Sequence, residues 1–148
     1  MHVFLNTIKI DYRKLITLEH ILKNGPAFTL GGIREWLSKR HQNGLIHVLV
    51  QIDNNLFFDE FSWNVWLSQD KDEVSDYRDL RTRKQILERS SLKESKLDDW
   101  LRKRQFNGLH VAVIKKGPRR LYIDIKLFNR WLSSRNKNSE FARTPDIA

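Results

Sequence analysis

The sequence predicts an α+β protein made of two tandem units, each with the order helix, helix, β-hairpin, helix. Three observations lead to this prediction: the chain repeats itself, each copy changes from helical to alternating periodicity, and turn residues separate the segments. The 148 residues are 40% hydrophobic and include five tryptophans and eight phenylalanines. These large side chains supply the apolar area that two small cores need.

The repeat appears when the sequence is shifted by 64 residues against itself. IREWLSKRHQNGL at 33–45 then aligns with LDDWLRKRQFNGL at 97–109, and after one inserted residue the alignment continues to Ser68 and Ser133. The two copies share 13 identities over positions 36–68, against roughly two expected from ordinary composition. Because stacked arrays usually need three or more repeats, we interpret the duplication as a tandem pair.

Each copy begins with two predicted helices. The first spans 18–24 or 83–89, and the second lies near 30–41 or 92–105, where apolar residues recur at three- and four-residue spacing. Ser91 and Glu94 have the spacing of a capping box, which predicts a helix start there. An Asn-Gly pair then ends the second helix, because both residue types tolerate positive φ.

Two strand-like runs follow in each copy and predict a hairpin. In the first copy the runs at 46–52 and 56–58 are joined by DNN, and in the second the runs at 110–114 and 121–123 are joined by KKGPRR. Asp59 and Asp124 stand at the N-cap position of a last helix, which buries one apolar face. A helix-turn-helix followed by a hairpin is the winged-helix arrangement. We interpret the repeated tryptophans, at 36, 66, 100 and 131, as core.

These elements set the predicted domain boundaries. The first winged helix-turn-helix unit spans 1–70 and has an acidic wing, a polar linker spans 71–82, and the second unit spans 83–134 with a basic wing. The polar segment 135–148 is predicted to be a disordered tail. Weak alternation within 1–14 favours an added edge strand.

Charge is divided unevenly between the copies. Residues 1–76 hold 8 Lys and Arg against 10 Asp and Glu, whereas residues 77–148 hold 19 against 8, within a total net charge of +9. This distribution favours binding of a polyanion to the second copy, although a basic surface that only improves solubility is the alternative. The candidate DNA-contacting residues lie on the predicted second helix and the wing tip: Lys93, Ser95, Lys96, Arg102, Lys103, Lys115, Lys116, Arg119 and Arg120.

Different roles are expected along this set. The three residues nearest the helix start, Lys93, Ser95 and Lys96, are expected near bases, because recognition helices contact bases through their N-terminal residues. Arg102 and Lys103 are expected at phosphates. The alternative for both the helix and the wing is an ordinary solvated charged face.

Several classes of function are not supported by the sequence. The chain has no cysteine, so it has no disulfide or zinc-thiolate site, and its five histidines lack a repeated metal-ligand spacing. No nucleophile elbow, phosphate-binding glycine loop or paired-carboxylate motif is present. We therefore expect no enzyme activity, metal or cofactor. No apolar run reaches the length of a membrane span, and a cytoplasmic, nucleoid-associated location is expected.

The second copy carries a further pattern, in which a hairpin of the form v-i-x-x-G-x-r-x-x-I precedes an acidic residue and F-x-x-W-L. Residues 83–134 thereby resemble the excisionase-like and MerR-like winged-helix proteins of phages and integrating elements. The first copy matches less well, because DNN replaces the Gly-Arg wing. The residues that carry the resemblance are Asn107, Gly108, Leu109, Gly117, Arg119, Arg120, Ile123, Asp124, Phe128, Trp131 and Leu132.

The resemblance implies a non-catalytic protein that binds double-stranded DNA and either directs a recombinase or regulates a promoter. A homodimer or a cooperative assembly on DNA is compatible with that role. An adaptor is the alternative: the first unit would dock a recombinase or polymerase through Phe57, Phe58 and Trp63.

Overall fold

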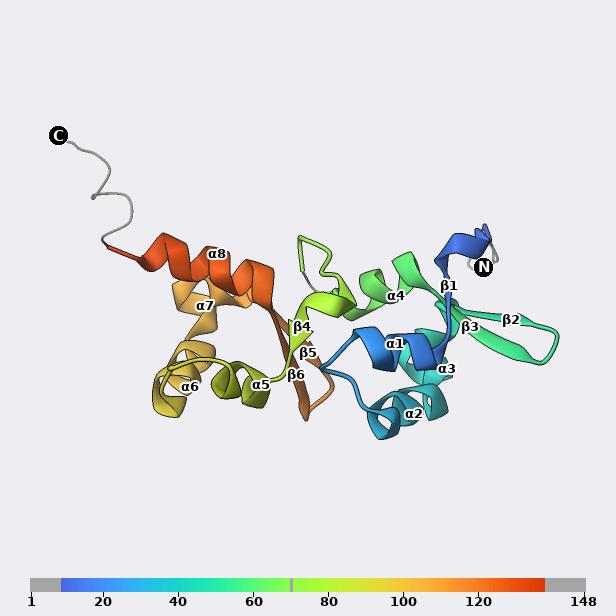
Figure 1. The fold of residues 1–148 in the computed structure, drawn as a ribbon, viewed down its shortest axis with the longest axis horizontal. Coiled ribbons are helices and arrows are strands. Elements are labelled where there is room, and N and C mark those ends of the chain that lie inside the picture. The colour runs from blue at the N-terminus through green and yellow to red at the C-terminus, as the bar shows by residue number, and fades with distance from the viewer. Residues whose placement is uncertain (1–8, 70, 138–148) are drawn as a thin grey trace. The chain divides into compact units, whose positions relative to one another are not determined.

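The computed structural model describes residues 9–69 and 71–137 and divides the chain into two compact units, Met1–Leu80 and Arg81–Ala148 (Figure 1). The fold is α+β, as predicted: the described residues form eight α-helices and two three-stranded antiparallel sheets. The predicted tail lies outside the described residues except for 135–137, and α8 extends to Arg135.

The first unit contains a sheet of order β1-β3-β2, whose β2–β3 hairpin extends beyond the helices of that unit (Figure 1). The edge strand predicted within 1–14 lies outside the described residues except for 9–14, which contain a 3₁₀ turn at Tyr12–Lys14, and a short strand, β1, follows at residues 15–16 and pairs with the C-terminal end of β3. The elements in chain order are β1 (Leu15–Ile16), α1 (Leu18–Asn24), α2 (Leu30–Ser38), α3 (Arg40–Asn43), β2 (Leu49–Ile52), β3 (Asn55–Asp59) and α4 (Glu60–Leu67).

The second unit repeats this order with a sheet of order β4-β6-β5. Its strand β6 leads directly into the last helix, as β3 does in the first unit. The elements are β4 (Leu80–Arg81), which begins at the division between the units, α5 (Arg83–Glu88), α6 (Glu94–Arg102), α7 (Arg104–Asn107), β5 (Val113–Lys116), β6 (Arg120–Asp124) and α8 (Ile125–Arg135).

Threonines rather than serines cap the early helices. Thr17, Thr29 and Thr82 accept backbone hydrogen bonds at the starts of α1, α2 and α5, and Thr82 forms a reciprocal capping box with Gln85. The capping box predicted at residues 91–94 is wrong, because α6 has Lys93 as its N-cap and no side-chain cap bond.

The single helix predicted after the turn is two helices in each unit. A non-helical residue, Lys39 or Lys103, separates α2 from α3 and α6 from α7. The short helix then ends at a glycine in the left-handed region, Gly44 with φ 83° or Gly108 with φ 85°. The Asn-Gly stop is therefore confirmed, although only the glycine of each pair adopts positive φ.

The asparagine of each pair has a different role, because it joins the helix stop to the last helix. In the first unit the Asn43 amide donates to the Trp36 carbonyl at 3.0 Å, and the Asn43 carbonyl accepts from the Trp66 indole at 2.9 Å. Asn107 makes the same two bonds, at 3.1 Å to the carbonyl of Trp100 and at 2.8 Å from the indole of Trp131. The repeat thus preserves a complete hydrogen-bonded junction.

The tryptophans of this junction also pack on each other. The rings of Trp36 and Trp66 meet edge to face with centroids 5.3 Å apart, and those of Trp100 and Trp131 at 5.2 Å. Trp36, Trp66 and Trp131 are buried, which confirms the core prediction for these three, whereas Trp100 is half-buried.

The first strand of each hairpin begins later than predicted, and the second strand begins one residue earlier. Residues 45–47 and 109–112 form 3₁₀ turns, and β5 continues to Lys116 while β6 already begins at Arg120. The extension of β5 to Lys116 has a physical reason. Because β5 is an edge strand, a lysine within it can keep its charge in solvent. Both predicted helix caps are confirmed: Asp59 and Asp124 accept backbone hydrogen bonds at the starts of α4 and α8.

The segment predicted as a polar linker, 71–82, is instead structured in its second half. It contains a 3₁₀ turn at Tyr77–Asp79 and strand β4, and its Ser75, Tyr77 and Leu80 are buried. A shift of 65 residues explains this, since DYRKLIT at 11–17 aligns with DYRDLRT at 76–82. These residues are the beginning of the second repeat and not a spacer.

The junction glycines can be tested by substitution. Gly44→Ala and Gly108→Ala each place a Cβ in the left-handed region, so each is expected to lower the free energy of unfolding by about 1–2 kcal/mol. Gly31→Ala is the matched control, because no atom lies within 4 Å of its added Cβ and alanine favours helix α2. Urea unfolding followed by circular dichroism measures all three, and equal midpoints would contradict the expected strain.

Candidate nucleic-acid interface

The segment predicted as a basic wing is the β5–β6 hairpin, and it distributes its charges over two faces. In the β5–β6 register Lys116 lies opposite Arg120, next to the buried pair of Ile114 and Tyr122 on the same face. Lys115 lies opposite a leucine on the other face and is exposed. The prediction that four cations gather at the tip is therefore wrong in part.

Only one of the four predicted wing residues lies in the turn itself. Gly117, with φ 75°, begins the turn at 117–119, and Arg119 projects from it with an exposed side chain. Lys116 and Arg120 flank the turn on the strands and are half-buried. The hairpin therefore presents Lys115 and Arg119 most openly.

Arg120 is held by a buried neighbour on its own strand. Burial raises the pKa of Tyr122 to about 12, and the charge and hydrogen bond of the nearby Arg120 side chain act in the opposite direction. The phenol is thus neutral at physiological pH. Because Arg120 is both half-buried and engaged with Tyr122, it is positioned by the fold more firmly than Arg119.

Helix α6 carries the other half of the predicted site. Lys93 is its N-cap, and Ser95 and Lys96 lie in its first turn, all with exposed side chains. Within residues 9–69 and 71–137, neither of these two lysines forms an ion pair. The N-terminal end of α6 therefore offers two cations and a hydroxyl to solvent.

The C-terminal end of α6 is less available. Arg102 and Lys103 both pair with the carboxylate of Asp99, at 2.5 Å and 3.3 Å. These ion pairs are exposed, so each is weak in water. Asp99 nevertheless lowers the combined charge at this end of α6 from the +2 of Arg102 and Lys103 to +1, which reduces the attraction for a phosphate.

A cluster of charges joins the first two helices of the second unit. Arg83 at the start of α5 contacts Asp98 on α6 through two bonds, at 2.5 Å and 2.9 Å, and also contacts Glu94. These bonds raise the pKa of Arg83 and lower that of Asp98. The first unit has Leu18, Leu30 and Arg34 at the aligned positions, so this connection belongs to the second unit alone.

Comparison of the aligned positions identifies what separates the two units chemically. The scaffold is shared, but the candidate contact residues of the second unit are replaced by uncharged residues in the first, with one exception at Lys39 and Lys103. The aligned residues of the first unit are Thr29, Gly31, Gly32, Ser38, Gln51, Ile52 and Asn55, opposite Lys93, Ser95, Lys96, Arg102, Lys115, Lys116 and Arg120.

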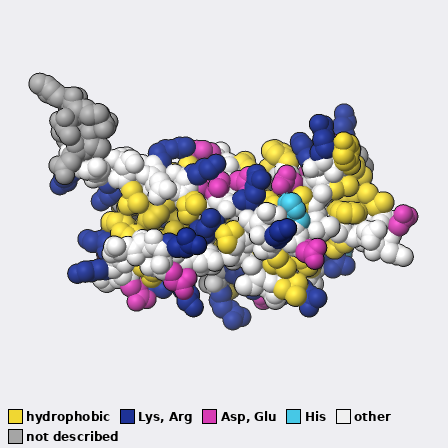
Figure 2. Space-filling model, viewed as in Figure 1, with side chains coloured by type: hydrophobic (Ala, Val, Ile, Leu, Met, Phe, Trp, Pro, Cys, Tyr) yellow, Lys and Arg dark blue, Asp and Glu magenta, His cyan; other side chains and the backbone are white. Residues whose placement is uncertain are grey.

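The last helix shows the same exchange, which sequence reasoning missed. Phe61 and Val65 on α4 align with Lys126 and Arg130 on α8, all with exposed side chains. The 65-residue shift pairs these positions directly and was the available signal. On the face drawn in Figure 2, Lys and Arg side chains are interspersed with Asp and Glu and do not form one continuous patch.

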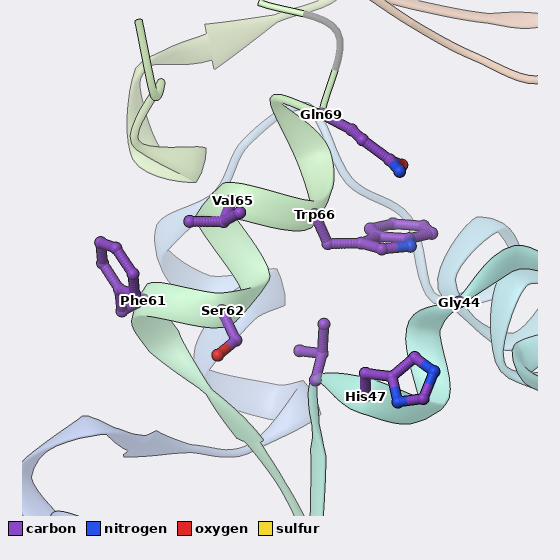
Figure 3. A pocket seen from close by; sticks show the side chains of 8 residues that line it. Gly44, His47, Phe61, Ser62, Val65, Trp66 and Gln69 are labelled. Carbon is purple, nitrogen blue, oxygen red and sulfur yellow. The ribbon is translucent and has the colours of Figure 1, made fainter. Parts of the chain in front are cut away.

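The first unit has an apolar pocket beside this part of α4. The pocket has a volume of about 300 Å³, and Figure 3 shows Phe61 and Val65 along one side with Trp66 and His47 on the other. Phe61 is 59% exposed and Val65 39% exposed. The prediction that Phe57, Phe58 and Trp63 form a docking surface is wrong in part, because Trp63 and Phe58 are fully buried.

No group of three or more residues able to hold a metal ion occurs in the part of the chain that the structure describes. The described helices also include none with the length and apolar character needed to cross a bilayer.

The residues behind the excisionase-like resemblance take up defined roles in the second unit. Asn107 and Gly108 end α7, Gly117 begins the hairpin turn, Asp124 caps α8, and Trp131 completes the junction. The resemblance itself stays a prediction. Comparison with protein-family models finds no match, and neither the curated proteins nor the solved structures compared with this chain match it.

Proposed function

We propose that the protein is a non-catalytic double-stranded DNA-binding protein in which the second unit, folded as a winged helix-turn-helix, makes the main DNA contact. One observation carries the proposal: the candidate basic positions of α6 and the wing hold Lys or Arg in the second copy and uncharged residues in the first, apart from Lys103 and its counterpart Lys39, while α2 has one exposed cation, Arg34, where α6 has Asp98. A charge pattern that only improved solubility would not need to differ at matched positions of α6, the wing and α8.

The contact is assigned to two elements. An α-helix fits the major groove of B-DNA, and recognition helices approach bases with their N-terminal residues, which places Lys93, Ser95 and Lys96 at base edges. Lys115 and Arg119 on the wing then meet the phosphate backbone or the minor groove. Arg102 and Lys103 reach phosphate only in competition with Asp99.

The biological role follows from the family resemblance. The resemblance to excisionase-like and MerR-like proteins implies a protein that directs a recombinase or regulates a promoter, so we propose a recombination accessory factor or a transcriptional regulator of a mobile element. Such a protein would be cytoplasmic and associated with the nucleoid. A recombinase partner would be recruited through the first unit.

Adaptor function is the second candidate, and a specific observation favours it for the first unit. Phe61 and Val65 are exposed beside an apolar pocket, and exposed apolar surface next to a concavity is typical of protein docking sites. This function is separable from DNA binding, since the double variant Phe61→Ala, Val65→Ala would lose the partner and keep its DNA affinity.

Charge neutralisation tests the DNA contact. The variant K93A/K96A/K115A/R119A is expected to bind duplex DNA at least about 10-fold more weakly, because most of the affinity of such proteins comes from phosphate neutralisation. Its plot of log affinity against log salt should also flatten by about 0.9 for each phosphate that the variant no longer neutralises. Fluorescence anisotropy over a salt series measures both quantities.

The matched control removes the same charge from the first unit. K14A/K23A/R34A/K39A replaces four cations there and is expected to retain the affinity of the unmodified protein within about threefold. If the two variants weakened binding equally, net charge alone would explain the affinity and the proposed interface would be wrong.

Releasing the cations of α6 should strengthen binding. Asp99→Asn frees Arg102 and Lys103 from their shared carboxylate and is expected to raise DNA affinity by about threefold to tenfold at low salt, the scale of an exposed ion pair. Glu88→Gln changes the net charge equally on α5, away from these cations in the sequence. Equal gains from the two variants in a filter-binding titration would count against a role for these cations.

A further inference from the structure

A short motif, Asp-Tyr-Arg, occurs at residues 11–13 and again at 76–78 with the same local structure. In each copy the aspartate caps a 3₁₀ turn and the arginine two residues later returns to pair with it, at 2.8 Å for Arg13 and 2.6 Å for Arg78. A two-residue strand and a threonine-capped helix follow both copies. The two motifs are therefore structural equivalents.

The second motif is docked on the helices of the first unit. Tyr77 is 0% exposed, and its backbone N–H donates to the side-chain oxygen of Asn64 at 2.8 Å. Its ring packs closely against Gly25, because a Cβ added to that glycine would lie only 2.9 Å from the ring. The preceding segment is fixed as well, because the Ser75 N–H donates to the Ser68 hydroxyl at 2.8 Å. The receiving surface is thus the face of α4 that carries Asn64, together with Ser68 that follows it, beside the end of α1.

The first motif has no such cover among the described residues. Tyr12 is 80% exposed, although its aspartate and arginine neighbours hold the same conformation as in the buried copy. Burying the apolar ring of an exposed tyrosine is favourable in free energy, and the turn that carries Tyr12 is already held in the conformation of the buried copy. The first motif is therefore shaped for docking but undocked.

The receiving surface is also present twice. Asn64, Leu67 and Ser68 of the first unit align with Asn129, Leu132 and Ser133 of α8, and each pair is identical. Exposure differs at every pair: Leu67 and Ser68 are buried and Asn64 is half-buried, whereas Leu132 is half-buried and Asn129 and Ser133 are exposed. The surface on α8 therefore carries the same three residues as the occupied surface on α4, and among the described residues these side chains are more exposed to solvent than their counterparts.

We propose that the Asp-Tyr-Arg motif at 11–13 of one molecule docks on α8 of a second copy of the same chain, as residues 76–78 dock on α4. Within the described part of the chain, each molecule carries one exposed copy of the motif, in its first repeat, and one exposed copy of the receiving surface, in its second. The contact joins unlike surfaces, so it is heterologous and continues from molecule to molecule in a head-to-tail series.

The intermolecular contact is weaker than the contact within one chain, for three reasons. A covalently linked motif benefits from a high effective concentration, which a separate molecule lacks. The charge of Glu60, which acts on Arg78 and Tyr77, is absent at the aligned Ile125. Ser90 also replaces Gly25, so the tyrosine ring must shift slightly to accommodate its Cβ.

Sedimentation velocity of the nuclease-treated full chain tests the proposal without DNA. Between about 10 μM and about 1 mM, a range suited to a small transient interface, the average mass should rise with concentration beyond that of a dimer. Tyr12→Ala, which removes the motif, and Asn129→Arg, which blocks the receiving surface, should each remain monomeric. Tyr12→Phe should associate like the unmodified chain, because the buried Tyr77 hydroxyl has no hydrogen-bond partner among the described residues.

Mixing the two monomeric variants is the decisive arm. Y12A keeps its α8 surface and N129R keeps its motif, so an equimolar mixture should form dimers and nothing larger. Thermal unfolding of each variant confirms that it is folded. Three results would each overturn the proposal: an unmodified chain that is monomeric at all concentrations, association that survives either substitution, or a mixture that stays monomeric. The first of these results would leave a different protein as the occupant of these surfaces.

Discussion

The hydrogen bond from the indole of the last helix to the asparagine carbonyl at the helix stop is the contact on which each unit depends. It joins residues 23 positions apart in the first unit and 24 in the second, and thereby fixes the last helix against the helices before the hairpin. The glycine that follows must adopt positive φ for the chain to turn there. With this junction fixed at both ends of the hairpin, the position of β5 and β6 relative to α6 is set within the second unit.

Duplication followed by divergence explains most of what differs between the units. The junction, the aspartate caps and the sheet order are kept, while the candidate contact positions of α6 and the β5–β6 hairpin, with Lys126 and Arg130 of α8, are mostly basic in the second copy and, apart from Lys39, uncharged in the first. Under the proposed function, a shared scaffold with exchanged surfaces lets one half of the chain contact a polyanion while the other half contacts protein. Under the proposed self-association, the same duplication supplies the motif at 11–13 and the receiving surface on α8 that join one molecule to the next.

Features set by local chemistry were predictable from the sequence, and those set by tertiary contacts were not. The helix stops and aspartate caps follow from residues whose backbone preference or short polar side chain acts within a few positions, so the pattern located them. The break at Lys39 and Lys103, the strand position of Lys116 and the burial of Tyr77 depend on neighbours distant in sequence. The candidate residues of α6 were placed on its exposed surface, but the neutralisation of Arg102 by Asp99 requires side-chain geometry.

The most direct test of a DNA contact confined to the second unit is a titration of the ¹⁵N-labelled full chain with a short DNA duplex, followed by amide chemical shifts at moderate salt. The account predicts that the largest changes occur at 93–96 and 113–120, with the amides of α2 and of the β2–β3 hairpin nearly unchanged. Changes of equal size at the aligned positions of both units, or changes confined to the first unit, would contradict it.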